Sequence, residues 1–260
     1  EAGEGETRRA SLACRSRRGA VGAAVGGEGT LLSVAVLAGG MSRRMGSDKA
    51  MLRLGAGDAP LLQLALERVR PLTDDCFVVA SDRPAYARFG APVVADRRPG
   101  LGPLGGIATA LAAARHDFVL VVACDMPLLS LPLLRFMRDV PRDYDVLVPT
   151  LRGESRQGKG AVYQTLHAIY SRRCLAPIET RLDAGQLQVV GLFDQVTVRE
   201  IDEASVRRHD PDLHSFVNAN TPEAAAAAWR LLAAEAAAGN LLETRSSPIL
   251  EGVERKDDDD

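Results

Sequence analysis

Short apolar runs alternate with amphipathic stretches through the middle of the 260-residue chain, and no other feature of the sequence constrains the fold as strongly. The runs are rich in β-branched residues and cover residues 31–37, 76–80, 92–95, 118–123 and 146–148. Stretches with helical spacing lie between them at residues 61–69, 104–114 and 132–138. Buried strands of a parallel sheet have this composition, and helices connect them by right-handed crossovers. The pattern therefore predicts an α/β domain with a three-layer, doubly wound, mostly parallel sheet.

Two further elements are expected in the last third of the chain. Residues 187–190 and 195–198 are predicted to form a hairpin or a pair of edge strands. Thr221 and Pro222 are predicted to open an alanine-rich helix that ends near residue 238, because threonine caps helices and proline is tolerated in the first turn.

The two ends of the chain differ in composition from the middle. Residues 1–30 are rich in Gly, Ala, Arg and Glu without periodic hydrophobicity, and residues 239–260 end in Lys-Asp-Asp-Asp-Asp. We interpret the first segment as disordered or as an extension, and the last as a disordered tail or a tag. Residues 31–238 are then expected to form a single domain.

Composition argues against several classes of function. Aromatic residues make up 4% of the chain, which is few for stacking on single-stranded nucleic acid, and the net charge of -2 gives no overall attraction to nucleic acid or an anionic membrane. No apolar run approaches the ~18 residues of a membrane span. The four cysteines form no C-x-x-C pair, so neither a zinc site nor a disulfide framework is indicated and a reducing, cytoplasmic location is favoured. Because the net charge is slightly negative, any site that binds an anion must have its own positive groups close together in one loop or cleft.

The loop after the first apolar run has the composition of a polyphosphate-binding loop. Gly39, Gly40 and Gly46 allow close approach of the backbone, and consecutive amides there can surround phosphate oxygens. Arg43, Arg44 and Lys49 add positive charge. The spacing is not that of a Walker A loop. A glycine-rich turn with solvated basic side chains is the other interpretation.

A second glycine loop at residues 100–105 indicates a different function. Its sequence, Gly-Leu-Gly-Pro-Leu-Gly, matches Gly-x-Gly-x-x-Gly, follows a predicted strand and opens a predicted helix. Asp125 lies about where an acid that binds ribose would be expected, so an NAD-dependent oxidoreductase is an alternative. Against this, the loop follows the third strand instead of the first, and the basic loop at residues 39–49 would have no role.

Asp125 follows the apolar strand at residues 118–123 and is a candidate metal ligand. It would lie at the carboxyl edge of the sheet, where open α/β sheets bind ligands. A carboxylate together with substrate phosphates is the usual way in which proteins hold Mg²⁺. A helix cap before Pro127 or a turn aspartate would explain the residue equally well.

Several motifs, in order, resemble those of one family. They are Leu-Ala-Gly-Gly at 37–40, Arg-Met-Gly-Ser-Asp-Lys at 44–49, Gly-Pro-Leu-Gly-Gly-Ile at 102–107, Cys-Asp-Met-Pro at 124–127 and Phe-Val-Asn-Ala-Asn-Thr-Pro-Glu at 216–223. Together they are similar to the molybdenum cofactor guanylyltransferases, the MobA family of nucleotidyltransferases, over residues 32–232. The resemblance implies a Rossmann-like nucleotidyltransferase fold. It also implies transfer of GMP from GTP to molybdopterin with Mg²⁺, which releases pyrophosphate and forms the guanine dinucleotide.

The resemblance assigns roles to individual residues. The residues implied to bind the nucleotide, the metal or the acceptor are Leu37, Ala38, Gly39, Gly40, Lys49, Asp96, Asp125, Asn218 and Asn220. Among them Lys49 is implied to contact phosphate, Asp96 to contact GTP, and Asp125 to bind both GTP and the metal. The asparagines are implied to lie near the pterin. Thr165 stands where related proteins usually have proline, which leaves Gln164 and His167 uncertain as pterin contacts.

The chemistry expected of such a site agrees with these roles. A phosphate of the acceptor attacks the α-phosphorus of the nucleotide in line, so the protein acts by positioning and by neutralising charge. Lys49, Arg44 and Asp125 are therefore the expected catalytic residues, with Asp125 on the metal.

Other activities and partners stay open from the sequence. The molybdopterin cytidylyltransferases tend to carry Leu-Ala-Ala-Gly where this chain has Leu-Ala-Gly-Gly, so the pattern favours GTP over CTP. Sugar-phosphate and phospholactate nucleotidyltransferases share the basic loop. A nucleotide-sensing module without chemistry would be expected to lack Lys49 or Asp125, and both are present. Transient docking to molybdopterin-insertion proteins or molybdoenzymes is a further hypothesis.

Overall fold

The computed structural model describes residues 31–39, 48–53, 59–81, 83–155 and 158–237. Its strands are β1 (Ser33–Leu37), β2 (Asp75–Ala80), β3 (Val93–Ala95), β4 (Phe118–Ala123), β5 (Val146–Ser155), β6 (Gly158–Tyr163), β7 (His167–Ser171) and β8 (Val198–Ile201). Its α-helices are α1 (Leu61–Val69), α2 (Gly102–Ala113), α3 (Leu131–Asp139), α4 (Leu175–Asp183), α5 (Glu203–Arg207) and α6 (Pro222–Ala237). Short 3-10 helices include η1 (Lys49–Met51), η5 (Val190–Gln195) and η6 (His214–Phe216).

The described strands form one eight-stranded sheet in the order β3-β2-β1-β4-β7-β5-β6, with β8 also paired to β5. Strands β3, β2, β1 and β4 are parallel to one another, and β5 is parallel to β8. Strand β7 runs antiparallel to both β4 and β5, so these two strands point the same way. The carboxyl ends of β1, β2, β3, β4, β5 and β8 therefore lie at the same edge. The prediction of a mostly parallel sheet is confirmed.

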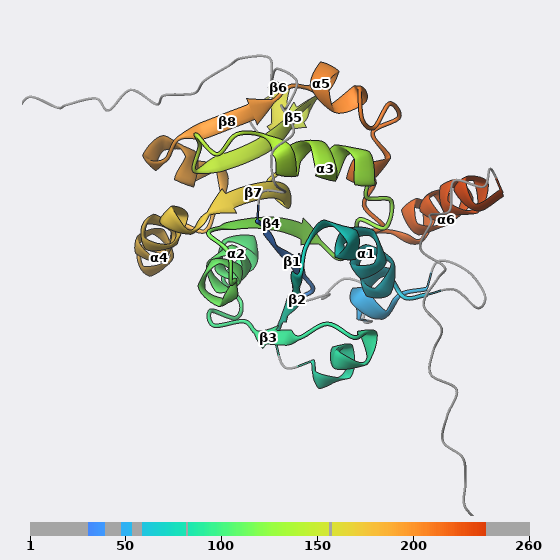
Figure 1. Cartoon of the computed structure of the whole chain (residues 1–260), viewed down its shortest axis with the longest axis horizontal. Helices are drawn as coiled ribbons and strands as arrows, with labels where there is room; N and C mark the ends of the chain where they lie inside the picture. Colours follow the sequence, from blue (N-terminus) through green and yellow to red (C-terminus); the bar gives the residue numbers. More distant parts are fainter. Residues whose placement is uncertain (1–30, 40–47, 54–58, 82, 156–157, 238–260) are drawn as a thin grey trace, which may run out of the picture.

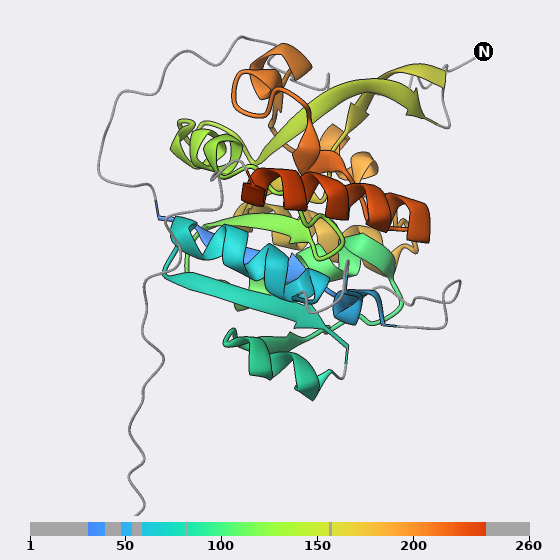
Figure 2. The ribbon, with the colours of Figure 1, turned by 90° about the vertical axis from the view of Figure 1, so that its right-hand side faces the viewer.

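Helices cover both faces of the sheet and give it three layers (Figures 1 and 2). One face packs its buried aliphatic side chains against α1 and α3, and the other face packs against α2 and α4. Strands β1 and β4 are in the middle of the sheet and are almost entirely buried, because helices cover them on both sides. This explains why the two strands are continuous apolar runs instead of alternating ones.

The hairpin predicted over residues 187–190 and 195–198 is wrong. Residues Val190–Gln195 form a 3-10 helix, and β8 begins only at Val198 and pairs in parallel with β5. Leu192 and Phe193 are buried in the core beneath α2 and α4. The apolar residues that suggested two strands thus pack a short helix onto the sheet.

Helix α6 begins as predicted. The hydroxyl oxygen of Thr221 accepts a hydrogen bond from the backbone N–H of Ala224 at 3.2 Å, which caps the first turn. An ion pair of 2.6 Å between Arg68 and Glu235 connects α1 with α6. Within the described residues, no helix is long and apolar enough to cross a membrane. The proposed end segments, residues 1–30 and 239–260, lie outside the described residues.

Candidate functional site

The predicted nucleotide-binding segment lies at the carboxyl edge of the sheet, where β1 ends. The backbone N–H of Ala38 donates to the carbonyl of Val79 at 2.9 Å, and the N–H of Cys124 donates to the carbonyl of Leu37 at 3.1 Å. These bonds hold the segment between the ends of β2 and β4. The loops that follow β1 and β4 therefore lie side by side, as the carboxyl-edge rule for α/β sheets predicts.

Gly39 is exposed at this edge, and the protein leaves space beside it. A Cβ atom built at this position would lie 3.8 Å from Cα of Ala80 and 3.9 Å from the backbone N of Ser81, which are ordinary contacts. Packing against the described residues therefore does not require glycine at residue 39.

Three of the predicted site residues are joined at the end of β4. The ammonium group of Lys49 donates to the side-chain oxygen of Asn220 at 2.9 Å. One residue earlier, the N–H of Ala219 donates to the carbonyl of Asp125 at 2.9 Å. The segment before α6 thus connects the lysine that follows the first glycine loop with the aspartate that follows β4.

Asp125 is a half-buried carboxylate whose charge is only partly compensated by the protein. Burial raises the pKa of Asp125 above its ordinary value, and the positive charge of Lys49 opposes this effect. No group of three or more His, Cys, Asp or Glu side chains among the described residues could hold a metal ion. Asp125 alone fits Mg²⁺ bound largely through substrate phosphates and water, because such a site needs only one or two carboxylates from the protein.

Asp48 and Tyr86 support the short helix on which Lys49 lies, and neither residue was predicted to belong to the site. The Asp48 carboxylate accepts hydrogen bonds from the Tyr86 hydroxyl at 2.6 and 2.8 Å and from the N–H of Ala50 at 3.1 Å. Asp48 thereby caps η1, the short helix on which Lys49 is the first residue. An aspartate just before a short helix is a capping signal that the sequence contains. Tyr86 lies 38 residues away along the chain and has no such signal.

We expect Tyr86→Phe to reduce turnover about fivefold to tenfold, because Lys49 loses part of the support that positions it. The lost hydrogen bond should also lower the free energy of unfolding by about 1 kcal/mol. Tyr144→Phe is the matched control, since Tyr144 is a buried tyrosine whose hydroxyl bonds with Arg142 instead. Turnover and chemical denaturation are measured for both variants. Equal losses of turnover would contradict a positioning role for Tyr86.

Asp96 follows β3 at the same edge, further along the sheet from Asp125. One oxygen of its carboxylate accepts hydrogen bonds from the hydroxyl of Thr109 and from the N–H of Arg98, each at 3.0 Å. The residue thus ties the turn after β3 to helix α2. Its predicted contact with GTP stays a prediction.

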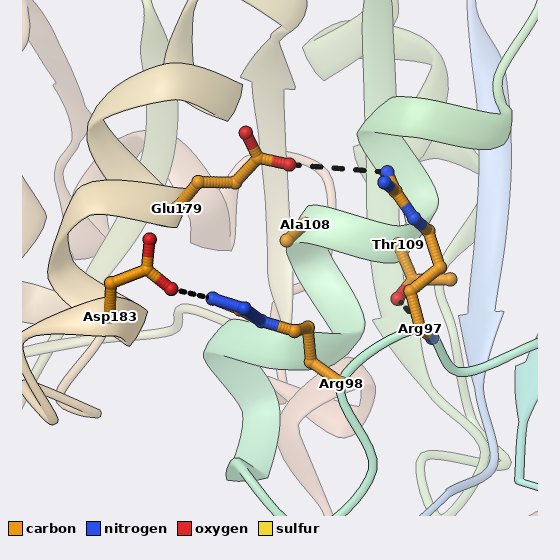
Figure 3. Close-up of a pocket in the computed structure, with 6 residues that line it drawn as sticks. All are labelled: Arg97, Arg98, Ala108, Thr109, Glu179 and Asp183. Atoms are coloured by element: carbon orange, nitrogen blue, oxygen red, sulfur yellow. Dashed lines mark hydrogen bonds and ion pairs between the residues drawn. The ribbon is translucent and has the colours of Figure 1, made fainter.

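A small cavity of about 160 Å³ lies beside Asp96, between α2 and α4 (Figure 3). Two arginines from the turn after β3 line it and point toward α4. Arg98 forms an ion pair with Asp183, and Arg97 lies 4.0 Å from Glu179. The carboxylates of α4 compensate both charges, so we do not assign these arginines to the phosphates of the nucleotide.

The glycines at residues 100–106 bring helix α2 close to the ends of β1 and β3. Gly100 and Gly102 have positive φ values of 85° and 70°. A Cβ atom at Gly105 would lie 2.9 Å from the carbonyl oxygen of Arg98, and one at Gly106 would lie 3.0 Å from the side chain of Leu37. Packing of the helix therefore accounts for the last glycine of the Gly-x-Gly-x-x-Gly match.

His167 is fully buried in β7, under the segment that contains the Asn-x-Asn motif. Its ring centroid lies 4.8 Å from that of Phe216, and neither ring nitrogen has a hydrogen-bond partner among the described residues. Burial lowers the pKa of His167 to about 3. Gln164 is half-buried and its side chain lies 3.4 Å from the carbonyl of Val162. A direct contact of His167 with a ligand is therefore not supported in this conformation.

The predicted site residues fall into three groups. Those that meet at the ends of β1 and β4 are Leu37, Ala38, Gly39, Lys49, Asp125, Asn218 and Asn220. Asp96 lies at the same edge but faces helix α2. Gly40 and Arg44 lie outside the described residues, so their roles stay predictions.

The chain is similar over most of its length to one family of proteins. A model of the family described as MobA-like NTP transferase domain matches residues 34–198. A molybdenum cofactor guanylyltransferase of Desulfosudis oleivorans is 34% identical over 189 residues, which are 72% of this chain and 89% of that protein. One of Syntrophotalea carbinolica is 34% identical over 191 residues, covering 74% of this chain and 87% of that protein.

Solved structures agree with this similarity. The molybdopterin-guanine dinucleotide biosynthesis protein A of Archaeoglobus fulgidus matches with a TM-score of 0.65 and 25% identity, covering 78% of this chain and 99% of that chain. The 4-diphosphocytidyl-2C-methyl-D-erythritol synthase of Anaerococcus prevotii matches with a TM-score of 0.58 at 15% identity, covering 79% of this chain and 97% of that chain. The second match is a likeness of fold alone.

Proposed function

The chain belongs to the MobA-like NTP transferase family, whose members similar to it include molybdenum cofactor guanylyltransferases, and from this we propose that it transfers GMP from GTP to molybdopterin with Mg²⁺. The products would be pyrophosphate and molybdopterin guanine dinucleotide. The observation that supports this proposal most strongly is the connection of Lys49, Asp125 and Asn220 at the carboxyl edge of the sheet. Because the chain belongs to a family of nucleotidyltransferases, we do not propose an oxidoreductase activity.

In this proposal the protein positions two phosphate groups and compensates their charge. A phosphate oxygen of molybdopterin attacks the α-phosphorus of GTP, and the bond to pyrophosphate breaks on the opposite side. Lys49 stabilises the negative charge that develops on the transferring and departing groups. Asp125 would hold Mg²⁺ together with GTP phosphates, and the ion would add positive charge next to the same oxygens. No side chain has to act as a nucleophile.

Asn220 has a supporting role in this proposal. Its side chain binds the ammonium group of Lys49, which leaves two of the three N–H donors of the lysine for phosphate oxygens. The adjacent hydrogen bond from the N–H of Ala219 to the carbonyl of Asp125 holds Asn220, and with it Lys49, close to Asp125. The Asn-x-Asn motif can therefore act on the charges of the site as well as on the acceptor.

The experiment that tests the proposal measures the dinucleotide product directly. Purified protein is incubated without oxygen with molybdopterin, Mg²⁺ and either GTP or CTP, and products are separated by chromatography together with released pyrophosphate. Formation of the guanine dinucleotide only with GTP and Mg²⁺ supports the proposal. Product with CTP alone would assign the chain to cytidylyl transfer, and pyrophosphate release with a sugar phosphate instead would assign another nucleotidyltransferase activity.

Gly39→Ala is expected to weaken the use of GTP without destabilising the protein. The added methyl group fits against the protein, and Gly39 is not among the described glycines with positive φ, so we expect no loss of folding free energy. If the purine of GTP lies over this position, KM for GTP should rise about tenfold and KM for CTP should rise less. Both constants and the midpoint of thermal unfolding are measured. Unchanged KM values would contradict a nucleotide contact at Gly39.

Docking to other proteins of cofactor traffic and a cytoplasmic location are also proposals. Because cofactors in transit are usually protected from water, we propose transient contact with a molybdopterin-insertion protein or a molybdoenzyme. Pull-down with such proteins in the presence of GTP tests the contact. Failure to detect any complex at micromolar protein concentrations would contradict it.

A further inference from the structure

Thr109 lies on helix α2 next to Asp96, and it was not predicted to belong to the site. The residue is fully buried, and three groups are within hydrogen-bond distance of its hydroxyl oxygen. The hydroxyl accepts a bond of 3.1 Å from the N–H of Arg97 (Figure 3). It also lies 3.0 Å from one carboxylate oxygen of Asp96 and 3.1 Å from the carbonyl oxygen of Gly105. A buried polar group with these contacts fixes the position of the groups around it.

The single hydroxyl proton of Thr109 favours Asp96 over Gly105. The carbonyl of Gly105 is four residues earlier on α2, so it already accepts the backbone N–H of Thr109 in the regular bonding pattern of a helix. A bond to a carboxylate is charge-assisted and roughly twice as strong as one between neutral groups. Thr109 therefore donates to Asp96 while it accepts from Arg97, and it fastens the turn after β3 to α2 at two consecutive residues.

A glycine one turn earlier on α2 allows this contact. A Cβ atom at Gly105 would lie 2.9 Å from the carbonyl oxygen of Arg98, so a larger residue would push the turn away from the helix. Residues 105 and 109 are four apart and lie on the same face of the helix. The close approach at Gly105 thus brings the turn within reach of the hydroxyl of Thr109.

These contacts occupy one of the two carboxylate oxygens of Asp96. The first oxygen, Oδ1, accepts bonds from the hydroxyl of Thr109 and the N–H of Arg98, each at 3.0 Å. The backbone N–H of Asp96 donates to the carbonyl of Ala80 at 3.1 Å. The described residues give the second oxygen, Oδ2, no hydrogen bond. Asp96 therefore presents one acceptor oxygen, in a fixed position, to a donor group of a bound molecule.

The pairing register places Asp96 level with Gly39 and Asp125. One row of paired residues crosses the four parallel strands and consists of Val94, Val79, Leu37 and Ala123. Asp96, Gly39 and Asp125 are each two residues beyond this row, along strands that point the same way. Three strand spacings separate β3 from β4, which is about 14 Å. A nucleotide with its phosphates at Asp125 can therefore extend past Gly39 to Asp96.

We infer that Thr109 is a positioning residue of the nucleotide site, because its hydroxyl holds Asp96 so that the second carboxylate oxygen can accept a hydrogen bond from the nucleoside part of GTP. The inference rests on the proposed function, which takes GTP as the substrate and Asp96 as one of its contacts. Thr109 does not touch the nucleotide in this arrangement and acts through Asp96. Loss of its hydroxyl should therefore weaken the binding of GTP and leave the chemical step, at Lys49 and Asp125, almost unchanged.

The variants Thr109→Val and Thr109→Ser separate the hydroxyl from the packing. Valine has nearly the shape of threonine and a similar preference for helices but no hydroxyl, whereas serine keeps the hydroxyl and lacks the methyl group. We expect Thr109→Val to raise KM for GTP about fivefold to tenfold and to change kcat less than about twofold. Thr109→Ser should stay within about twofold of the wild type in both constants. Binding of GTP with Mg²⁺ and without molybdopterin, measured by equilibrium dialysis, should weaken by the same factor in Thr109→Val.

Thr180→Val is the matched control. Thr180 is an exposed threonine of α4 whose hydroxyl donates to the carbonyl of Ala176, four residues earlier in the same helix, at 3.1 Å. Its substitution removes a helical threonine hydroxyl that does not hold a carboxylate, and KM for GTP should not change. Asp96→Ala should raise KM for GTP at least as much as Thr109→Val does. The double variant should bind GTP no more weakly than Asp96→Ala alone, because Thr109 then has no carboxylate to hold.

The midpoint of thermal unfolding, measured for each variant, shows that the proteins compared are folded. Equal losses of GTP binding in Thr109→Val and Thr109→Ser would show that Thr109 acts through packing, and the inference would be wrong. It would also be wrong if Thr109→Val bound GTP like Thr180→Val, or if the losses of Thr109→Val and Asp96→Ala multiplied in the double variant. In these cases the proposed function stands as long as the wild-type protein forms the guanine dinucleotide. If the wild-type protein binds GTP but forms no dinucleotide, the proposed function is wrong, and weaker GTP binding by Thr109→Val still supports the inference.

Discussion

Replacing Asp125 by asparagine is expected to lower turnover with GTP, molybdopterin and Mg²⁺ by ~10²-fold or more, the usual effect of removing one preorganised charge. Asparagine has nearly the same size and keeps an oxygen, so the variant tests the negative charge and not the packing. The backbone carbonyl that accepts the N–H of Ala219 is unchanged. The variant should therefore keep the arrangement of the segment before α6.

The same substitution should not destabilise the protein without ligands. Burial raises the pKa of Asp125, so folding favours its protonated form, and the ionised carboxylate costs stability at pH values above its ordinary pKa. The neutral asparagine removes that cost at pH 7. We expect an equal or higher midpoint of thermal unfolding for Asp125→Asn at pH 7, and a difference from the wild type that shrinks as the pH falls through the raised pKa.

Steady-state kinetics over a range of Mg²⁺ concentrations and thermal unfolding between pH 4 and 8 would measure both effects. Asp194→Asn is the control for a charge change elsewhere on the surface. Turnover of Asp125→Asn within threefold of the wild type would refute the assignment of the metal to this residue. A large loss of stability at pH 7 would show that the carboxylate has a structural role instead.

Lys49→Met is expected to lower turnover by a comparable ~10²-fold, because methionine keeps the length of the side chain and removes its charge. Its effect should depend on Asn220, whose side chain binds the lysine at 2.9 Å. Asn220→Ala alone should reduce turnover about tenfold by loosening Lys49. The double variant should be hardly slower than Lys49→Met, since the asparagine has no ammonium group left to position.

A double-mutant cycle of turnover and of GTP affinity measures this dependence. Lys49→Arg keeps the positive charge and should be more active than Lys49→Met. It should be less active than the wild type, because the planar guanidinium group cannot take the place of the compact ammonium group. If the losses of Lys49→Met and Asn220→Ala are multiplicative, Asn220 acts independently of the lysine, and its role lies with the acceptor.

The strands and helices that surround the nucleotide-binding half of the sheet could be predicted from the sequence. Strand β4 and helix α1 have the predicted bounds, because a buried strand has a continuous apolar run and an amphipathic helix has a regular apolar spacing. The rule that ligands bind at the carboxyl edge of the sheet then correctly predicted that Lys49 and Asp125 lie close together. These features depend on local patterns and on a general rule of the fold.

The other half of the sheet could not be predicted in the same way. Strands β5, β6 and β7 form antiparallel pairs, and the hairpin is half exposed, so its glycines and polar residues give no continuous apolar run. Helix α4 has few buried residues and was not predicted. Asp48 and Tyr86 are 38 residues apart in the sequence, and His167 and Phe216 are 49 apart. No local sequence pattern predicts either contact.

The hydrogen bond between Lys49 and Asn220 joins residues 171 positions apart. During synthesis on the ribosome, domains form from the amino terminus onward, and contacts between residues that are distant in the sequence form late. Lys49 therefore lacks this partner until almost the whole domain has emerged. A translation product that stops before residue 218 would contain every described strand of the sheet but would lack the segment that connects Lys49 with Asp125. We expect such incomplete chains to use GTP at least tenfold more slowly than the complete domain, so that activity rises when the last segment of the domain is added.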